Sequence, residues 1–178
     1  MFEINDIRKR SKNILNFWKK PHNWIPEQCR EEVLLPNIQW YLQLTECLEI
    51  WSNKEGEATT EELCLAYAIL GELIEGWLRL YYCIYFAHYM ALEDSGKNKI
   101  KKQEEMTFEE LEDFARGKVW QKGDGYDFFV TQIKSKRKCV SEDNKDRIGV
   151  LDDFLFDLDL YEEFIENIDI RLPYPDKH

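Results

Sequence analysis

Residue types that mark particular folds are scarce in this chain of 178 residues. It has 8 glycines and 5 prolines, too few for the many tight turns of an all-β fold. Its most apolar stretch, "LYYCIYFAHYMAL" at 80–92, is shorter than the about 20 residues that a membrane-spanning helix needs. The N-terminal "MFEINDIRKRSKN" is polar where a signal peptide has an apolar core. We therefore expect a cytoplasmic protein with no membrane span.

Motifs for metal binding and nucleophilic catalysis are also missing from the sequence. The chain has 3 histidines, and none has a second histidine at the helical spacing of a zinc site. No Gly-x-Ser-x-Gly nucleophile motif and no glycine-rich phosphate loop occurs. A carboxylate stripe near the C-terminus is typical of a solvated helix face rather than a cation site. The sequence therefore predicts no catalytic residue, no metal site and no cofactor. The stripe consists of Asp159, Glu162, Glu166 and Asp169.

The cysteines give no sign of a disulfide framework. There are 5 of them, an odd number, and no Cys-x-x-Cys pair occurs. Most of them lie in apolar stretches with helical spacing, which is typical of reduced thiols in a cytosolic protein. We therefore expect all five thiols to be reduced. They are Cys29, Cys47, Cys64, Cys83 and Cys139.

Basic residues are few, and their distribution is uneven. The formal net charge is −11, yet residues 1–30 hold seven basic and three acidic residues. Residues 31–96 hold two basic and twelve acidic residues, and residues 150–178 hold two and nine. A molecule with this net charge repels a polyanion at long range. Any nucleic-acid site must therefore be a local basic patch, and residues 134–138 are the densest candidate.

Apolar residues recur at helical spacing along most of the chain, which predicts an all-α fold. We expect a helical bundle of about five or six helices, with a long central helix at 60–93. The pairs Thr59–Glu62 and Thr107–Glu110 have the spacing of capping boxes, and Pro36 is expected to kink or split the second helix. The expected helices cover residues 4–20, 26–52, 60–93, 108–117, 126–139 and 149–170.

The chain is long enough for one domain. We expect an N-terminal helical segment, residues 1–25, to pack on a bundle formed by residues 26–178. The central helix carries more aromatic residues than one buried face requires, which favours a homodimer that buries part of them. The candidate interface residues are Trp77, Tyr81, Tyr82, Tyr85, Phe86, His88 and Tyr89.

Four basic residues fall within five positions, "KSKRK" at 134–138. They are expected at the C-terminal end of a helix, where cations complement the helix dipole. The same cluster could instead contact phosphates or an acidic surface across a dimer, and the sequence leaves these alternatives open. The four candidates for phosphate or RNA binding are Lys134, Lys136, Arg137 and Lys138.

Three stretches together resemble the HEPN superfamily of helical bundles. "LGELIEGWLRLYYCIYFAHY" at 70–89 resembles the long helix of that family, in which a Gly and a Glu precede an aromatic run. "FFVTQIKSKRKCVS" at 128–141 lies where such proteins carry an Arg, an Asn, two apolar residues and a His. "DRIGVLDDFLFDLDLYEEFIENIDIRLPYPD" at 146–176 resembles the closing helix and Pro-rich tail of bacterial members.

The resemblance implies a ribonuclease motif that has lost its base. In HEPN ribonucleases the His assists attack by the RNA 2′-hydroxyl and the Arg stabilises phosphate charge, without a metal. Arg137 matches the Arg, but Ser141 stands where the His is expected. Serine has no group that titrates near neutral pH, so it cannot replace imidazole. The motif formed by Arg137 and Ser141 is therefore interpreted as degenerate.

We accordingly expect a non-catalytic interaction module in an RNA- or defence-related bacterial system. It is expected to form a homodimer and to be able to bind a further protein partner. RNA is expected to bind weakly if at all. Two alternatives remain: a metal-independent ribonuclease of the HEPN type whose active site lies elsewhere, and an RNA- or nucleotide-binding regulator that keeps Arg137 for phosphate.

Overall fold

The computed structural model describes residues 4–20, 35–93, 105–140 and 148–174, and for residues 35, 36, 86–93 and 140 only the backbone. Within these residues the chain is an all-α bundle, as predicted. The elements are α1 (Ile4–Trp18), α3 (Leu35–Cys47), α4 (Glu49–Ser52), α5 (Thr60–Glu93), α6 (Phe108–Ala115), α7 (Gly125–Lys136), the short 3₁₀ helix η3 (Arg137–Val140) and α8 (Leu151–Asp169).

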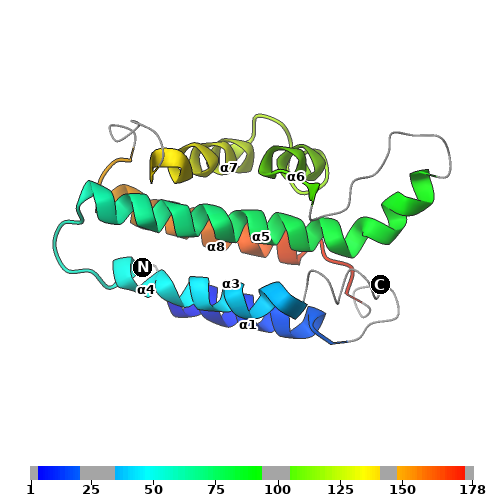
Figure 1. Cartoon of the computed structure of the whole chain (residues 1–178), viewed down its shortest axis with the longest axis horizontal. Coiled ribbons are helices and arrows are strands. Elements are labelled where there is room, and N and C mark those ends of the chain that lie inside the picture. Colours follow the sequence, from blue (N-terminus) through cyan, green and yellow to red (C-terminus); the bar gives the residue numbers. More distant parts are fainter. Residues whose placement is uncertain (1–3, 21–34, 94–104, 141–147, 175–178) are drawn as a thin grey trace.

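Helix α5 is the centre of the bundle (Figure 1). It packs against α3, α6, α7, η3 and α8. Helices α6 and α7 cover one side of α5, and α1 and α3 lie on the opposite side (Figure 1). A single hydrophobic core joins all of these elements. The prediction of one long central helix is therefore confirmed.

Helix α1 belongs to the same core, although it does not pack mainly on α5. It contacts α3 and α8. Its buried face has the spacing of an amphipathic helix, and its opposite face is polar and exposed. The N-terminal segment thus packs on the bundle at α1, while the expected boundary at residues 25 and 26 lies outside the described residues. The buried apolar residues of α1 are Ile4, Ile7, Ile14, Leu15 and Trp18.

The second expected helix differs from the prediction within its described part. Helix α3 begins at Leu35, so Pro36 lies in the first turn, where a missing backbone N–H costs no helical hydrogen bond. The expected helical residues before Leu35 lie outside the described residues, so a split of the helix near Pro36 stays a prediction. A break that the prediction lacked comes at Leu48, between α3 and α4. Both predicted capping boxes are present, because Thr59 pairs with Glu62 and Thr107 with Glu110.

Two glycines let other elements approach α5 closely. A Cβ atom at Gly71 would lie 2.8 Å from Cβ and 2.7 Å from Cδ of Arg137. A Cβ atom at Gly76 would lie 2.6 Å from the Tyr41 ring. Real Cβ atoms do not approach so closely, so glycine at these positions is what allows η3 and α3 to pack on the central helix.

Most of the described aromatic side chains of α5 face the core of their own chain. Trp77, Tyr81 and Tyr82 are 4%, 5% and 3% exposed, so the aromatic excess at these positions is buried without a second subunit. The Tyr85 hydroxyl donates to the Arg171 carbonyl oxygen at 2.7 Å. The side chains of the other three interface candidates, Phe86, His88 and Tyr89, lie outside the described residues. A homodimer stays a prediction.

The cysteines correct one expectation. Cys83 is buried and disulfide-bonded, whereas Cys47, Cys64 and Cys139 are free thiols. The expectation of five reduced thiols is therefore wrong at Cys83, and Cys29 lies outside the described residues. Reduced thiols were one argument for a cytoplasmic location, beside the polar N-terminal stretch. The disulfide removes this one argument, and the location stays a prediction. Among the described residues, no helix combines the length and apolar character needed to cross a membrane.

Candidate functional site

The basic segment, residues 134–138, spans the end of α7 and the start of η3. Asp124 starts α7 as its N-cap, and its side chain accepts from the Asp127 backbone N–H at 3.0 Å. At the other end of the helix, Lys134 and Lys136 occupy the last turn, where cations complement the helix dipole. Each of the four basic side chains meets different surroundings, which decide what the segment can do.

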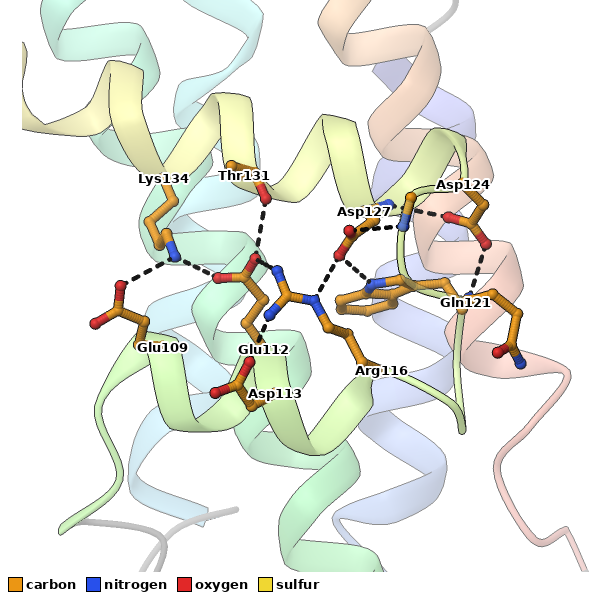
Figure 2. Close-up of polar contacts among 11 residues, drawn as sticks. Glu109, Glu112, Asp113, Arg116, Gln121, Asp124, Asp127, Thr131 and Lys134 are labelled. Atoms are coloured by element: carbon orange, nitrogen blue, oxygen red, sulfur yellow. Dashed lines mark hydrogen bonds and ion pairs between the residues drawn. The ribbon is translucent and has the colours of Figure 1, made fainter.

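Lys134 is bound to a buried carboxylate of α6. Its Nζ atom lies 2.5 Å from Oε2 of Glu112, a side chain with no exposed surface. The second oxygen of Glu112 accepts from Arg116 at 2.5 Å and from the Thr131 hydroxyl at 3.0 Å. Figure 2 shows this cluster between α6 and α7, with the more exposed Glu109 at its edge. The Lys134 ammonium therefore compensates a buried charge.

Arg116 extends the cluster to Asp127 on α7. Its Nε donates to Asp127 Oδ1 at 2.6 Å, and the Trp120 indole N–H donates to the same oxygen at 3.1 Å. The Gly123 backbone N–H donates to Oδ2 at 2.8 Å. Burial acts to raise the pKa of Asp127, but these hydrogen bonds, led by that of Arg116, outweigh it and hold the pKa below its ordinary value of 3.8.

We expect the stabilising effect of Asp127 to be constant near neutral pH and to be lost in acid. A carboxyl group whose pKa is lower in the folded protein stabilises it fully above the unfolded pKa and loses this effect as pH falls through the folded pKa. Asp127→Asn should therefore lower the unfolding temperature at about pH 7, and the gap to wild type should narrow below about pH 4. Asp113→Asn, which removes a 69% exposed partner of Arg116, is the matched control. A gap that is constant from neutral to acid pH would contradict this assignment.

Lys136 is bound to a second buried carboxylate, Asp157 of α8. The Lys136 Nζ atom lies 2.8 Å from Asp157 Oδ2, and the two side chains are 10% and 3% exposed. The Tyr67 hydroxyl of α5 donates to the same oxygen at 2.7 Å and accepts from Lys136 at 2.8 Å. Burial, and next the Asp157 charge, raise the pKa of Tyr67 far above its ordinary value. These three groups tie α5, α7 and α8 together.

Arg137 lies in a recess on α5. Its aliphatic carbons pack over Gly71, and its guanidinium donates to Glu75 at 2.5 Å. The guanidinium carbon also lies 4.6 Å from the centre of the Phe108 ring, in the range of a cation–π contact. The other oxygen of Glu75 binds Arg79, one turn further along α5, at 2.6 Å. Arg137 is therefore held by its own chain on three sides.

Lys138 and Ser141 remain from the sequence interpretation. Lys138 is exposed. Ser141 lies outside the described residues, so its position relative to Arg137 gives no test of the degenerate motif. The structure thus brings Lys134, Lys136 and Arg137 to three separate carboxylates, and it does not gather them around a common open site.

Two of these carboxylates are residues that the sequence interpretation missed. Neither Glu112 nor Asp157 was singled out from the sequence. Yet Glu112 has helical spacing to Phe108 and Ala115, which are buried, and Asp157 lies between the buried Phe154 and Tyr161. A carboxylate on the core face of an amphipathic helix needs a paired cation. That signal was present in the sequence, although it does not identify the cation.

Comparison of the chain with protein-family models, with curated proteins and with solved structures gave no match. The likeness to the HEPN superfamily therefore rests on the three stretches of sequence alone.

Proposed function

We propose that this chain is a non-catalytic helical interaction module, built on an HEPN-like bundle, in which the basic segment stabilises the fold. The observation that carries the proposal is the pairing of Arg137 with Glu75 and Phe108. A guanidinium that stabilises a phosphoryl transition state must aim its donors at the substrate. Here the Arg137 guanidinium donates to Glu75 and lies over the Phe108 ring.

Exposed apolar surface supports binding to another protein. A groove of about 720 Å³ lies between α7 and the start of α8. Its lining includes Phe128, which is 67% exposed, together with Gln132 and Lys136. Large apolar side chains at a concave surface are typical of protein contacts. A homodimer, a further protein partner and a role in an RNA- or defence-related bacterial system belong to the same proposal and follow from the sequence.

The proposal is tested with RNA under conditions that exclude metal-dependent nucleases. We expect wild-type protein, incubated with a panel of RNAs and a chelator, to give no cleavage above background. A missing general acid or base typically costs about 10²–10⁴-fold in rate. Arg137→Ala should lower the unfolding temperature because it leaves Glu75 without one of its two arginines, whereas Lys138→Ala should not.

The alternative, an HEPN-type ribonuclease, predicts that the wild-type protein cleaves RNA in the presence of the chelator. Robust cleavage that survives purification and disappears in an Arg137→Ala variant that is still folded would show that another group, such as His88 of a second copy, completes an active site. Circular dichroism of the variant at the assay temperature provides the folding control.

A further inference from the structure

The groove between α7 and the start of α8, about 720 Å³ in volume, has a lining with little free charge. We call it the α7–α8 groove. Asp127 in its lining is bound by Arg116, and Lys136 is bound by Asp157. Asp153 is thus the one lining charge without an opposite partner among the described residues. The other lining residues are Phe128, Thr131, Gln132, Ser135 and Gly149.

Exposed apolar side chains concentrate beside this groove. Seven large apolar side chains are exposed among the described residues, and three of them lie on α7 or at the start of α8. Phe128 of α7 is 67% exposed and lines the groove. Val150 and Phe156, both 62% exposed, each lie three residues from Asp153 and are its neighbours on the α8 side. Apolar side chains gathered at a concave surface are typical of a site for another protein.

The exposed face of α7 carries no charge, although charged residues make up 33% of the chain. An aromatic side chain among neutral residues has the composition of the centre of a protein interface, where charged residues are depleted. We therefore expect apolar contact rather than ion pairing to hold a partner on α7. The five exposed residues of α7 are Gly125, Phe128, Thr131, Gln132 and Ser135.

The groove has the length and the walls of a site for a helix. On α7 its lining extends from Phe128 to Ser135, about 10 Å at a rise of about 1.5 Å per residue. Apolar anchors at positions i, i+4 and i+7 of an amphipathic helix extend over the same distance. The two walls are the neighbouring helices α7 and α8, and side-chain ridges of a third helix pack into such a groove.

The α8 side of the groove is acidic. Helix α8 has eight acidic residues and no basic residue. Asp153 lines the groove, and Glu163 lies close to α7, where burial, and next the Glu163 charge, raise the pKa of Tyr126. Both carboxylates are exposed, and neither has an ion-pair partner in the part of the chain that the structure describes. Around Tyr126 the carboxylates outnumber the cations, with Asp124, Glu163 and Glu166 against Arg171.

We propose that the α7–α8 groove binds a basic amphipathic helix of another protein, with an apolar side chain of that helix against Phe128 and its lysines or arginines beside Asp153 and Glu163. This inference rests on the proposed interaction function and names the class of its partner. A second copy bound symmetrically through the same face brings two acidic α8 surfaces together, which is unfavourable. The same negative charge repels a nucleic acid.

The probe is a fluorescein-labelled model peptide of about 14 residues, made of leucine and lysine with the apolar spacing of an amphipathic helix. Fluorescence anisotropy with the full-length protein measures its affinity. We expect a dissociation constant below about 100 µM. Binding should be at least about tenfold weaker for a peptide with glutamate in place of lysine, and for a leucine–lysine peptide whose order lacks the helical period.

A variant of Phe128 locates the apolar contact. Phe128→Ser should weaken binding of the leucine–lysine peptide more than about tenfold, because an aromatic anchor at the centre of an interface carries much of the affinity. Ile50→Ser is the matched control, since it removes a 65% exposed apolar side chain on α4, away from the groove. It should change the affinity less than about twofold.

Charge-neutralising variants test the acidic side. Asp153→Asn/Glu163→Gln should weaken peptide binding about fivefold, because it removes two attractive charges. Asparagine keeps an acceptor for the Val150 backbone N–H, which Asp153 binds at 2.9 Å. Glu55→Gln/Glu57→Gln makes the same change of charge in the exposed loop before α5 and should have almost no effect. Circular dichroism at the assay temperature shows that each variant is folded.

Three results would overturn the inference. The first is no binding of the leucine–lysine peptide at about 100 µM protein. The second is an equal effect of Phe128→Ser and Ile50→Ser, which would place the peptide outside the groove. The third is a dimer of the wild type in light scattering that becomes a monomer in Phe128→Ser, which would make a second copy the occupant. Failure of the peptide to bind, without RNA cleavage by the wild type, strikes this inference alone, whereas RNA cleavage strikes the proposed function.

Discussion

Replacing Glu112 by Ala is expected to lower the free energy of unfolding by about 3 kcal/mol, because removing one partner of a buried ion pair leaves the other uncompensated. Glu112 has no exposed surface and accepts from Lys134, Arg116 and Thr131. In the variant, the one carboxylate left to the ammonium of Lys134 among the described residues is the exposed Glu109, at 3.5 Å. Urea denaturation at neutral pH measures the loss.

Glu109→Ala is the matched control for this prediction. Glu109 lies on the same helix and contacts the same lysine, but its side chain is 79% exposed. An exposed ion pair contributes less than about 1 kcal/mol, so this change should be nearly neutral. Equal losses in the two variants would show that burial of Glu112 does not determine its contribution.

Lys136→Met should have an effect at least as large, about 3–5 kcal/mol, because it leaves the Asp157 carboxylate charged and 3% exposed. Methionine keeps the aliphatic packing of the lysine side chain while removing its ammonium group. The hydrogen bonds from Tyr67 and Gln132 to Asp157 remain. They offset part of the loss but supply no full charge.

The comparison for this variant is Lys138→Met, two positions along the chain. Lys138 is exposed, so its replacement should change the free energy of unfolding by less than about 1 kcal/mol. If the basic segment acted only through its surface, the two variants would have similar and small effects on stability. A small effect of Lys136→Met would therefore count against a structural role.

The helices themselves were predictable because their signals are local. The apolar spacing of α1, α5 and α8 and the capping boxes at Thr59 and Thr107 depend on residues within one or two turns. Errors arose where a helix boundary depends on packing. At Leu48, for example, the expected second helix is divided into α3 and α4.

The partners of the basic segment were not predictable in this way, because each lies far away in the sequence. Lys134 meets Glu112 across a turn between two helices, and Arg137 meets Glu75 from a different part of the chain. A run of basic residues gives the same pattern whether it faces solvent or buried carboxylates. Only the packing of α5, α6 and α8 around it distinguishes these cases, as Figure 2 illustrates for Lys134.

The aromatic run of α5 shows the same limit. Its excess over one helix face favoured a dimer contact, but α6 and α8 bring aromatic and polar partners to it. Tyr82 packs edge-on against Phe114 with ring centres 4.8 Å apart, and the Trp77 indole N–H donates to Tyr161 at 2.8 Å. A central helix that is covered on several sides needs apolar residues on all of them.

The most direct test of the structural role of the basic segment is a double-mutant cycle between Lys136 and Asp157. Lys136→Met, Asp157→Asn and the double variant are compared with wild type by urea denaturation. Asparagine keeps an acceptor for Tyr67, so the cycle isolates the charge pair. We predict that each single change destabilises strongly and that the double variant recovers a coupling energy of about 2–3 kcal/mol. Additive effects, with a coupling energy near zero, would contradict the conclusion that the Lys136–Asp157 ion pair stabilises the fold.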